Sequence, residues 1–336
     1  MKKYLLAFLT LLIYSISFAQ TARISLEHNG TSTIYSTLQA AYNAAVDDDI
    51  IILPGGTFTI QDSIKKRLNF IGAGISLDST QATSTSKLSK TSTGNGNLII
   101  CPEGNGTSFN GIHFFHQNYS IGISGLNGNC QFSLFNCFMQ GKITKGINCL
   151  IKNCLIGNFV DSLKNSVVKN TICEGFTYLT DCSIDNSMTE SYGSKSCITC
   201  DFRNCIFNNG AQYYTNYYNY PSPTCNFYNC LRINASGIYP NTSNEFNTIS
   251  IYGFSTLFNS SITGIVANPA KNYHLLPNSP GSNAGTDGTD IGIYGGLEPC
   301  PDGWVPSNPH IMVKSVSTSN TNDGKLNVNF KVRKGN

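Results

Sequence analysis

The chain has 336 residues, a formal net charge of +3 and only 12% charged residues, about half the usual ~25% of globular proteins. Asn makes up about one residue in nine, and the chain contains 17 Tyr and 19 Phe. This composition excludes a charge-rich disordered chain and a coiled coil, and the small net charge provides no basic surface for nucleic acid.

The first 19 residues predict a secretory signal peptide. Lys2 and Lys3 precede an apolar run over residues 4–18, and Ser17-Phe18-Ala19 places small residues at a cleavage site before Gln20. The run is shorter than the ~20 apolar residues of a spanning helix, which favours cleavage over an uncleaved membrane anchor. We therefore expect a mature chain from residue 20 that is secreted, extracellular or at the cell surface, without a transmembrane segment.

The start of the mature chain predicts a capped first rung. Residues 37–45 form a short amphipathic helical pattern in which Leu38, Ala41, Ala44 and Ala45 share one face. Residues 49–58 follow as a buried strand and turn. An open first strand would expose an edge that invites pairing with another chain, so the helix is expected to cover it.

A repeat organises the middle of the chain. An Asn followed by a small thiol or hydroxyl residue recurs at Asn136, Asn153, Asn170, Asn186, Asn204 and Asn229. Successive copies lie 17, 17, 16, 18 and 25 residues apart, and an earlier copy is expected at Phe109-Asn110-Gly111. Apolar residues stand two positions before each Asn, and small or apolar residues stand four positions before most of them.

The alternation within each copy predicts a short strand. Positions −4, −2 and 0 share one face, and the mostly polar positions −3 and −1 point the other way. Stacked strands, each turn of ~17 residues advancing ~4.8 Å, bury the first set in a continuous column. Asn suits the bend, because its amide can bond the equivalent amides above and below and its backbone tolerates the left-handed region.

This pattern predicts an all-β right-handed parallel β-helix, and the chain resembles the pectate-lyase-like β-helix superfamily over roughly residues 32–296. The capping helix and first strand resemble the start of exported β-helix proteins. Residues 273–292 resemble the closing motif of bacterial surface β-helix repeats. The resemblance specifies the fold better than an activity, since one fold hosts many functions.

The last forty residues are expected to be separate from the rungs. Three prolines mark a linker, and two alternating apolar runs flank the turn Asn322-Asp323-Gly324, as in a β-hairpin. We therefore divide the chain into a signal peptide at 1–19, a parallel β-helix with an N-terminal cap at 20–296, and a linker with a hairpin tail at 297–336. The tail either docks on the last rung or attaches the protein to something else.

Thirteen cysteines are present, and most occupy two columns of the repeat. Adjacent rungs bring Cys137 near Cys154, and Cys200 near both Cys182 and Cys225, within reach of a disulfide. We favour mostly unbonded thiols, because Thr171, Ser187 and Ser166 occupy the same columns. A zinc site at Cys197, Cys200 and Cys205 is the alternative, but a second close Cys pair is missing.

The resemblance implies where an enzyme of this superfamily would carry its chemistry: acidic Ca²⁺ ligands on one outer sheet, with a nearby Arg or Lys as base. The candidates are Asp185, Asp201, Arg203 and Lys169, with Lys152 beside them, all outward on successive rungs. A solvated ion-pair ladder is the favoured interpretation of these charges. No dense acidic cluster with calcium-like spacing occurs, so no cofactor is expected unless the protein is a lyase, which would use Ca²⁺.

Two histidines and a tyrosine-rich interval are the remaining candidate features. His113 and His116 lie on opposite faces of an expected strand, which is poor geometry for a metal. The longest repeat interval contains Tyr213, Tyr214, Tyr217, Tyr218 and Tyr220. A tyrosine loop beside a polar face is either a sugar-stacking platform or a loop packed on its own aromatic rings.

The sequence therefore predicts an exported, non-catalytic β-helix module that binds a polysaccharide or another cell-surface polymer. A Ca²⁺-dependent polysaccharide lyase or a glycoside hydrolase is the first alternative, and a structural stalk or adhesin spacer is the second. The oligomeric state, the ligand and the means of attachment are not specified by the residues.

Overall fold

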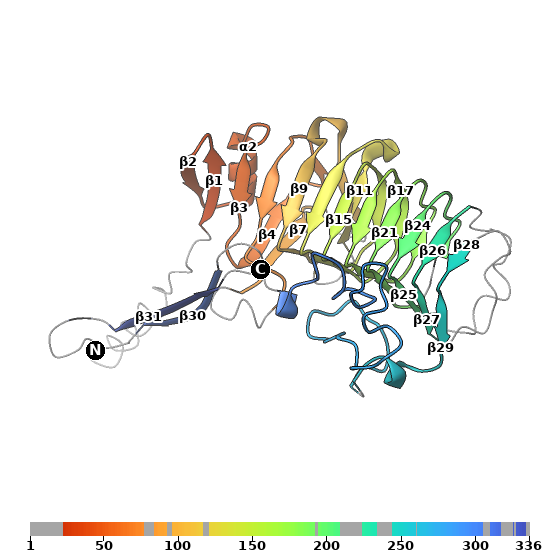
Figure 1. The fold of residues 1–336 in the computed structure, drawn as a ribbon. Helices are drawn as coiled ribbons and strands as arrows, with labels where there is room; N and C mark the ends of the chain where they lie inside the picture. The colour runs from red at the N-terminus through yellow and green to blue at the C-terminus, as the bar shows by residue number, and fades with distance from the viewer. Residues whose placement is uncertain are drawn as a thin grey trace, which may run out of the picture.

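The structure is a computed structural model that describes residues 23–76, 84–92, 96–116, 121–191, 194–208, 224–233, 244–259, 261–304, 310–316, 325 and 327–333. In these ranges the chain forms a parallel β-helix, as the repeat predicts, with three sheets and a separate hairpin (Figure 1). The predicted signal peptide and the tyrosine segment lie outside the described residues.

Sheet A contains one strand from most rungs. In spatial order its strands are β2 (Thr31–Tyr35), β1 (Ile24–His28), β3 (Ile50–Ile52), β6 (Asn69–Ile71), β9 (Thr107–Asn110), β12 (Phe132–Phe135), β15 (Leu150–Lys152), β18 (Val167–Lys169), β21 (Ser183–Asp185), β24 (Asp201–Arg203), β26 (Asn226–Tyr228) and β28 (Asn244–Phe246).

Sheets B and C complete the rungs. Sheet B contains β4 (Gly56–Ile60), β7 (Ser86–Lys90), β10 (Ile112–Phe114), β13 (Phe138–Met139), β16 (Leu155–Ile156), β19 (Ile172–Cys173), β22 (Met188–Thr189), β25 (Ile206–Asn208), β27 (Leu231–Ile233) and β29 (Ile249–Ile251). Sheet C contains β5 (Ser63–Ile64), β8 (Gly96–Ile100), β11 (Ile121–Gly125), β14 (Ile143–Ile147), β17 (Val160–Lys164), β20 (Phe176–Thr177) and β23 (Ser194–Lys195).

The first rung is capped by the expected helix, α2 (Leu38–Ala44). Thr37 is its N-cap and accepts a hydrogen bond from the Ala40 N–H, 3.2 Å away. Leu38, Ala41 and Ala45 of the predicted apolar face are buried, but Ala44 is exposed, and Tyr42 is buried in addition. The reason is the helical period, which places Tyr42 between Leu38 and Ala45 along the buried face and turns Ala44 away from it. The antiparallel pair β1–β2 precedes the helix and extends sheet A beyond β3. This pair was not predicted from the sequence.

Within the described ranges, short 3-10 turns occur at η2 (Pro102–Gly104), η3 (Leu126–Gly128), η4 (Phe254–Thr256) and η5 (Asp302–Trp304). The tail forms the predicted hairpin, in which β30 (His310–Val316) pairs antiparallel with β31 (Val328–Arg333). Figure 1 shows the hairpin at the end of the molecule opposite β28, so it does not cover the last rung.

The interior column of sheet A consists of the apolar position two residues before each Asn. In-register strands stack like on like: the rings of Phe70 and Phe109 lie 4.9 Å apart at 9°, and those of Phe202 and Phe227 lie 4.8 Å apart at 5°. These rings are almost fully buried. Their stacking fixes the register, because a slip of one residue would move every inward side chain to the outer face.

The corner between sheets A and B depends on the Asn of the repeat. All six Asn residues have φ between 48° and 54°, the left-handed region that Asn tolerates better than most residues. The next residue donates its side chain back to the carbonyl two residues earlier, as Thr171 Oγ1 does to Lys169 O at 2.9 Å. Cys137 Sγ donates to Phe135 O at 3.3 Å in the same way. The column therefore accepts Cys, Ser or Thr.

The earlier copy of the repeat is displaced by one residue from its predicted position. Strand pairing aligns Phe109 with Leu134 and Asn110 with Phe135, so Gly111 takes the corner position that Asn136 occupies one rung later. Gly111 has φ +68°. The reason is conformational: Gly adopts the left-handed region without a steric penalty, so this corner does not need an Asn.

The Asn side chains divide into two groups. Asn153 Nδ2 donates to Asn136 Oδ1 at 3.3 Å, and Asn136 Nδ2 donates to Asn110 Oδ1 at 3.1 Å. The next four amides instead donate to the C-terminal segment. Their acceptors are Glu298 O for Asn170, Gly292 O for Asn186, Thr286 Oγ1 for Asn204 and Ala284 O for Asn229.

Residues 281–300, named here the strap, therefore run along the side of the rungs. The sequence analysis likened residues 273–292 to a closing motif, but they lie against the A–B corner and not over the last rung. The physical reason is a second apolar cluster on the outer face of sheet B, which the C-terminal residues cover. It contains Leu155, Ile172, Met188, Ile206 and Leu231 of sheet B with Leu257, Phe258, Ile262, Ile265, Tyr273, Ile291, Ile293, Cys300 and Trp304.

We expect Asn153→Ala to lower the free energy of unfolding by about 2 kcal/mol, because Ala strains the left-handed backbone and loses the amide bond. Asn153→Gly keeps the backbone conformation, so it should lose only about 1 kcal/mol. Urea unfolding of both variants measures the difference. Equal losses would contradict a conformational role for this corner.

We expect Gly295→Ala to loosen the strap. A Cβ there would lie 1.7 Å from Asp290 O and 2.5 Å from Asn186 Nδ2, an overpacking that typically costs about 1–3 kcal/mol. Urea unfolding and limited proteolysis of the strap would detect the change. Gly264→Ala is the matched control, since its Cβ meets nothing within 4 Å.

Candidate functional site

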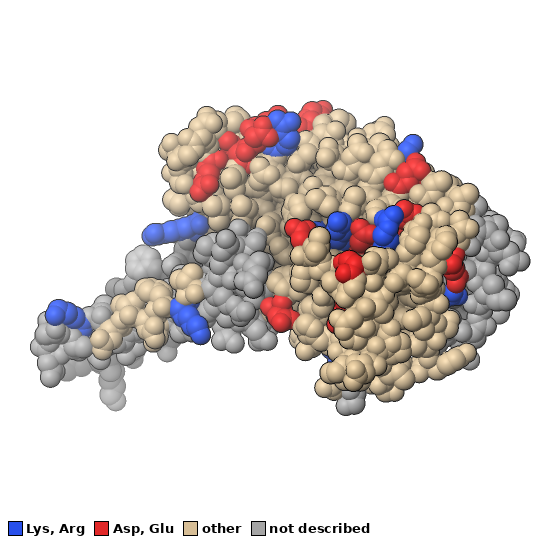
Figure 2. Space-filling model, viewed as in Figure 1, with Lys and Arg blue, Asp and Glu red and all other residues tan. Residues whose placement is uncertain are grey.

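The outer face of sheet A is the candidate site, because its outward residues remain half-buried or exposed. The outer face of sheet B, in contrast, is covered by the C-terminal residues of the second apolar cluster. On each strand the middle residue points inward and the two flanking residues point outward, a pattern repeated from β15 to β26. Figure 2 shows a row of alternating acidic and basic side chains across the middle of the molecule, apart from a second, mostly acidic group over the first rungs.

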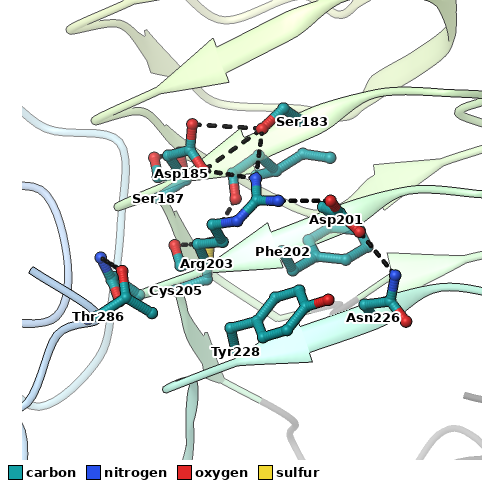
Figure 3. Close-up of polar contacts among 12 residues, drawn as sticks. Ser183, Asp185, Ser187, Asp201, Phe202, Arg203, Cys205, Asn226, Tyr228 and Thr286 are labelled. Carbon is teal, nitrogen blue, oxygen red and sulfur yellow. Dashed lines mark hydrogen bonds and ion pairs between the residues drawn. The ribbon is translucent and has the colours of Figure 1, made fainter. Parts of the chain in front are cut away.

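Arg203 is at the centre of this row (Figure 3). Its Nη2 lies 2.5 Å from Asp201 Oδ2 on the same strand, and its Nη1 lies 3.6 Å from Asp185 Oδ1 on the preceding rung. Nη1 also donates to Ser183 Oγ at 3.1 Å. The guanidinium lies over the Tyr228 ring, 5.4 Å from its centroid. One arginine thus joins three successive rungs.

The network continues toward β28 through aromatic rings and amides. The Tyr228 and Phe246 rings stack at 4.9 Å and 8°. Asn226 Nδ2 donates to Asp201 Oδ1 at 2.8 Å, and Asn244 Nδ2 donates to Asn226 Oδ1 at 3.0 Å. Because Tyr228 lies between Arg203 and Phe246, its ring faces are occupied, and its edge is what it presents outward.

The other end of the row is joined to the strap. Lys152 Nζ lies 2.6 Å from Glu298 Oε2, and Lys169 is aligned in register with both Lys152 and Asp185. Lys152 lowers the pKa of Glu298 through this hydrogen bond, and Lys169 adds to the effect through its charge. Three cations (Lys152, Lys169, Arg203) face three anions (Glu298, Asp185, Asp201), so the row has no net charge.

This geometry limits the chemistry of the row. The carboxylates of Asp185 and Asp201 both contact Arg203, so a Ca²⁺ ion bound between them would have to displace the guanidinium. Exposed ion pairs of this kind each contribute little to stability, about 0–1 kcal/mol. The arrangement presents hydroxyl, amide and aromatic groups at a regular ~4.8 Å spacing, which suits hydrogen bonding to an extended ligand.

The structure brings three of the four predicted candidates together, namely Asp185, Asp201 and Arg203, and places Lys169 one rung away. It adds Ser183, Asn226, Tyr228, Asn244 and Phe246, which the sequence analysis did not single out. Their signal was present, since they occupy the same −3 and −1 positions as the charged residues. Tyr213, Tyr214, Tyr217, Tyr218 and Tyr220 lie outside the described residues.

A second acidic pair was also missed. Glu174 and Glu190 follow strands β19 and β22, whose in-register pairing places them on adjacent rungs. Burial raises the pKa of both carboxyl groups. Glu190 accepts a hydrogen bond from the Ala267 N–H. This bond connects the rungs to the segment that covers sheet B, which gives Glu190 a structural role.

His113 lies on sheet B, stacked on Phe138 with ring centroids 4.5 Å apart. Its Nε2 is buried and has no hydrogen-bond partner among the described residues. Burial, together with the charge of Lys87, lowers the pKa of His113 to about 4. The imidazole is therefore held neutral in the folded state at physiological pH.

The described residues hold no group of three or more His, Cys, Asp or Glu side chains suited to a metal ion. None of the helices in the described ranges has the length and apolar character that crossing a bilayer requires. Comparison with known proteins found no family model that matches this chain and no curated protein of similar sequence.

We expect the stability of the protein to fall as the pH drops from 6.5 toward about 4. In that window the unfolded chain binds a proton at His113 while the folded protein excludes it, so stability declines by up to about 1.4 kcal/mol per pH unit. Below about 4 both states are protonated and this contribution stops changing.

His113→Phe should remove that part of the pH dependence and retain the stack on Phe138. Thermal or urea unfolding of both proteins between pH 8 and pH 4 tests this, with the difference at pH 8 as the baseline. A parallel decline in both proteins would show that His113 is not the group responsible.

Proposed function

We propose that this protein is an exported, non-catalytic β-helix module that binds an extended polysaccharide of a cell surface along the outer face of sheet A. The proposal is based on one observation: successive rungs of sheet A present hydrogen-bonding side chains in register, and every charge in the central row has an opposite charge nearby. A face of that kind favours a polymer of low charge density, and we propose a neutral glycan.

The repeat of the face supports this choice. Ser183, Asn226, Asn244 and the Tyr228 hydroxyl place donors and acceptors at rung intervals of ~4.8 Å, which is the scale of a sugar unit in an extended glycan. Each contact is weak by itself. Many equivalent contacts along one polymer add through effective concentration, so a shallow repetitive face can bind a long chain better than a single sugar.

The proposed location follows from the predicted signal peptide, which lies outside the described residues. The resemblance to the pectate-lyase-like superfamily and to bacterial surface β-helix proteins is consistent with this location. We include that resemblance in the proposal. Low surface charge, abundant Asn and a rod of stacked rungs also suit a structural spacer, so the binding test includes that alternative as an outcome.

A Ca²⁺-dependent lyase or a glycoside hydrolase is the competing proposal. It would need Arg203 or Lys169 available as a base and carboxylates open to a cation or substrate. Arg203 is engaged by two carboxylates, Ser183 and the Tyr228 ring. Catalysis at this face would first have to break that network, which is why we favour binding.

We expect residues 20–336 to be retained on insoluble neutral glycans and less on polygalacturonate, with no effect of calcium. Asn226→Trp, in the middle of the face, should weaken retention at least tenfold, equivalent to about 1.4 kcal/mol. Thr57→Trp is the matched control, because Thr57 is exposed on sheet B. Affinity electrophoresis or pull-down measures retention.

Three results would contradict the proposal. An unsaturated product absorbing in the ultraviolet, lost on Asp201→Ala or Arg203→Ala, would establish a lyase at this face. Release of reducing sugar, lost on the same changes, would establish a hydrolase. Absence of retention on every polymer would favour the spacer. A separate experiment tests the sequence-based prediction that the tyrosine segment binds sugar: retention is measured after replacement of Tyr217 and Tyr218.

A further inference from the structure

The thirteen cysteines are all buried and none forms a disulfide in this structure, yet several lie directly over one another on adjacent rungs. Strand pairing aligns Ser183 with Asp201 and Asp201 with Asn226, which places the preceding residues Cys182, Cys200 and Cys225 on three successive rungs. Backbone bonds hold this alignment, from Asp201 N to Cys182 O at 3.0 Å and from Asn226 N to Cys200 O at 2.9 Å.

The thiols in this column are close enough to affect one another's ionisation, since the neighbouring Cys182, Cys197 and Cys225 side chains raise the pKa of Cys200. Two further pairs lie one above the other at the A–B corner. Strand register and the backbone bonds from Leu155 N to Cys137 O at 2.9 Å and from Leu231 N to Cys205 O at 2.8 Å place Cys154 over Cys137 and Cys230 over Cys205. Cys200 precedes strand β24 and Cys205 follows it, so two of the thiols of the zinc alternative lie at opposite ends of one strand.

Adjacent rungs satisfy the distance requirement of a disulfide. Neighbouring strands lie ~4.8 Å apart, within the ~4.4–6.8 Å range of Cα separations that a disulfide allows. Residues two rungs apart are ~9.6 Å apart, beyond the ~7 Å limit. Cys182 and Cys225 can therefore each bond Cys200 but cannot bond each other.

We infer that these columns are sites of oxidative cross-linking between rungs, at Cys137–Cys154, at Cys205–Cys230, and at Cys200 with either Cys182 or Cys225. The oxidant is an external disulfide. Two protein thiols and one external disulfide give one protein disulfide and two external thiols, so electrons and protons balance. The inference does not depend on the proposed function.

The third site has two forms that interconvert without net oxidation. With Cys182 bonded to Cys200, the thiolate of Cys225 attacks Cys200 Sγ, forms the Cys200–Cys225 bond and releases Cys182 as a thiolate. The column on three successive rungs places the attacking sulfur opposite the leaving sulfur, as thiol–disulfide exchange requires. The neighbouring Cys200 side chain lowers the pKa of Cys182 and of Cys225, while burial opposes this shift.

The test is a map of thiols and disulfides in residues 20–336 after incubation with oxidised glutathione. The protein is unfolded in alkylating reagent without reduction, digested and analysed by mass spectrometry. Six of the thirteen cysteines should resist alkylation, leaving seven modified. Peptides should be joined at 137–154, at 205–230, and at 182–200 or 200–225. Cys173 and Cys300 are internal controls that remain thiols.

Variants separate the column mechanism from nonspecific oxidation. Cys200→Ser should abolish both forms at the third site and keep the other two cross-links. Cys225→Ser should give only Cys182–Cys200. Ser is tolerated at such positions, since Ser166 occupies the same column one rung before Cys182. Alkylation of all thirteen cysteines, a Cys182–Cys225 bond in Cys200→Ser, or cross-links to Cys173 or Cys300 would overturn the inference.

Discussion

Each rung of this β-helix has to turn between sheets without leaving buried carbonyl groups unpaired, and the rest of the structure depends on how it does so. At the A–B corner an Asn adopts the left-handed conformation, and the next side chain donates to the carbonyl two residues earlier. The corner between sheets C and A turns in the same way. Asn165 has φ 49°, and Ser166 Oγ donates to Lys164 O at 2.8 Å. Because the requirement is for a short donor, Ser, Thr and Cys are interchangeable there, which explains both the cysteine content and its arrangement in columns.

The same corners decide which faces remain open. By fixing where each strand begins, they place apolar residues on both sides of sheet B and polar residues on the outside of sheet A. The C-terminal residues cover the outer apolar face of sheet B and are held at the corner by four Asn amides. Sheet A is left with a repetitive, charge-neutral surface. Its availability for a ligand is thus a consequence of how sheet B is buried.

The column of Cys182, Cys200 and Cys225 and the Arg203 network belong to the same three rungs. Cys182, Cys200 and Cys225 each precede a strand whose outward residues form the Arg203 network. Cross-linking those rungs would fix their spacing and with it the positions of Ser183, Asp201 and Asn226. A rigid face loses less conformational entropy on binding an extended polymer, so the two features are physically compatible although neither requires the other.

The sequence by itself determined the rung. The 16–18-residue interval, the Asn corner, the inward apolar column and the helical pattern at residues 37–45 are local or periodic features, and strand alternation converts the repeat directly into a fold. Three things were decided only by the tertiary structure: the path of the strap, the division of the Asn amides between a ladder and the strap, and the pairing of Arg203 with both carboxylates. Each depends on contacts between residues far apart in the chain, such as Asn170 and Glu298. Such contacts leave no periodic pattern in the sequence, because the strap does not repeat. The apolar surface that the strap buries sets its position.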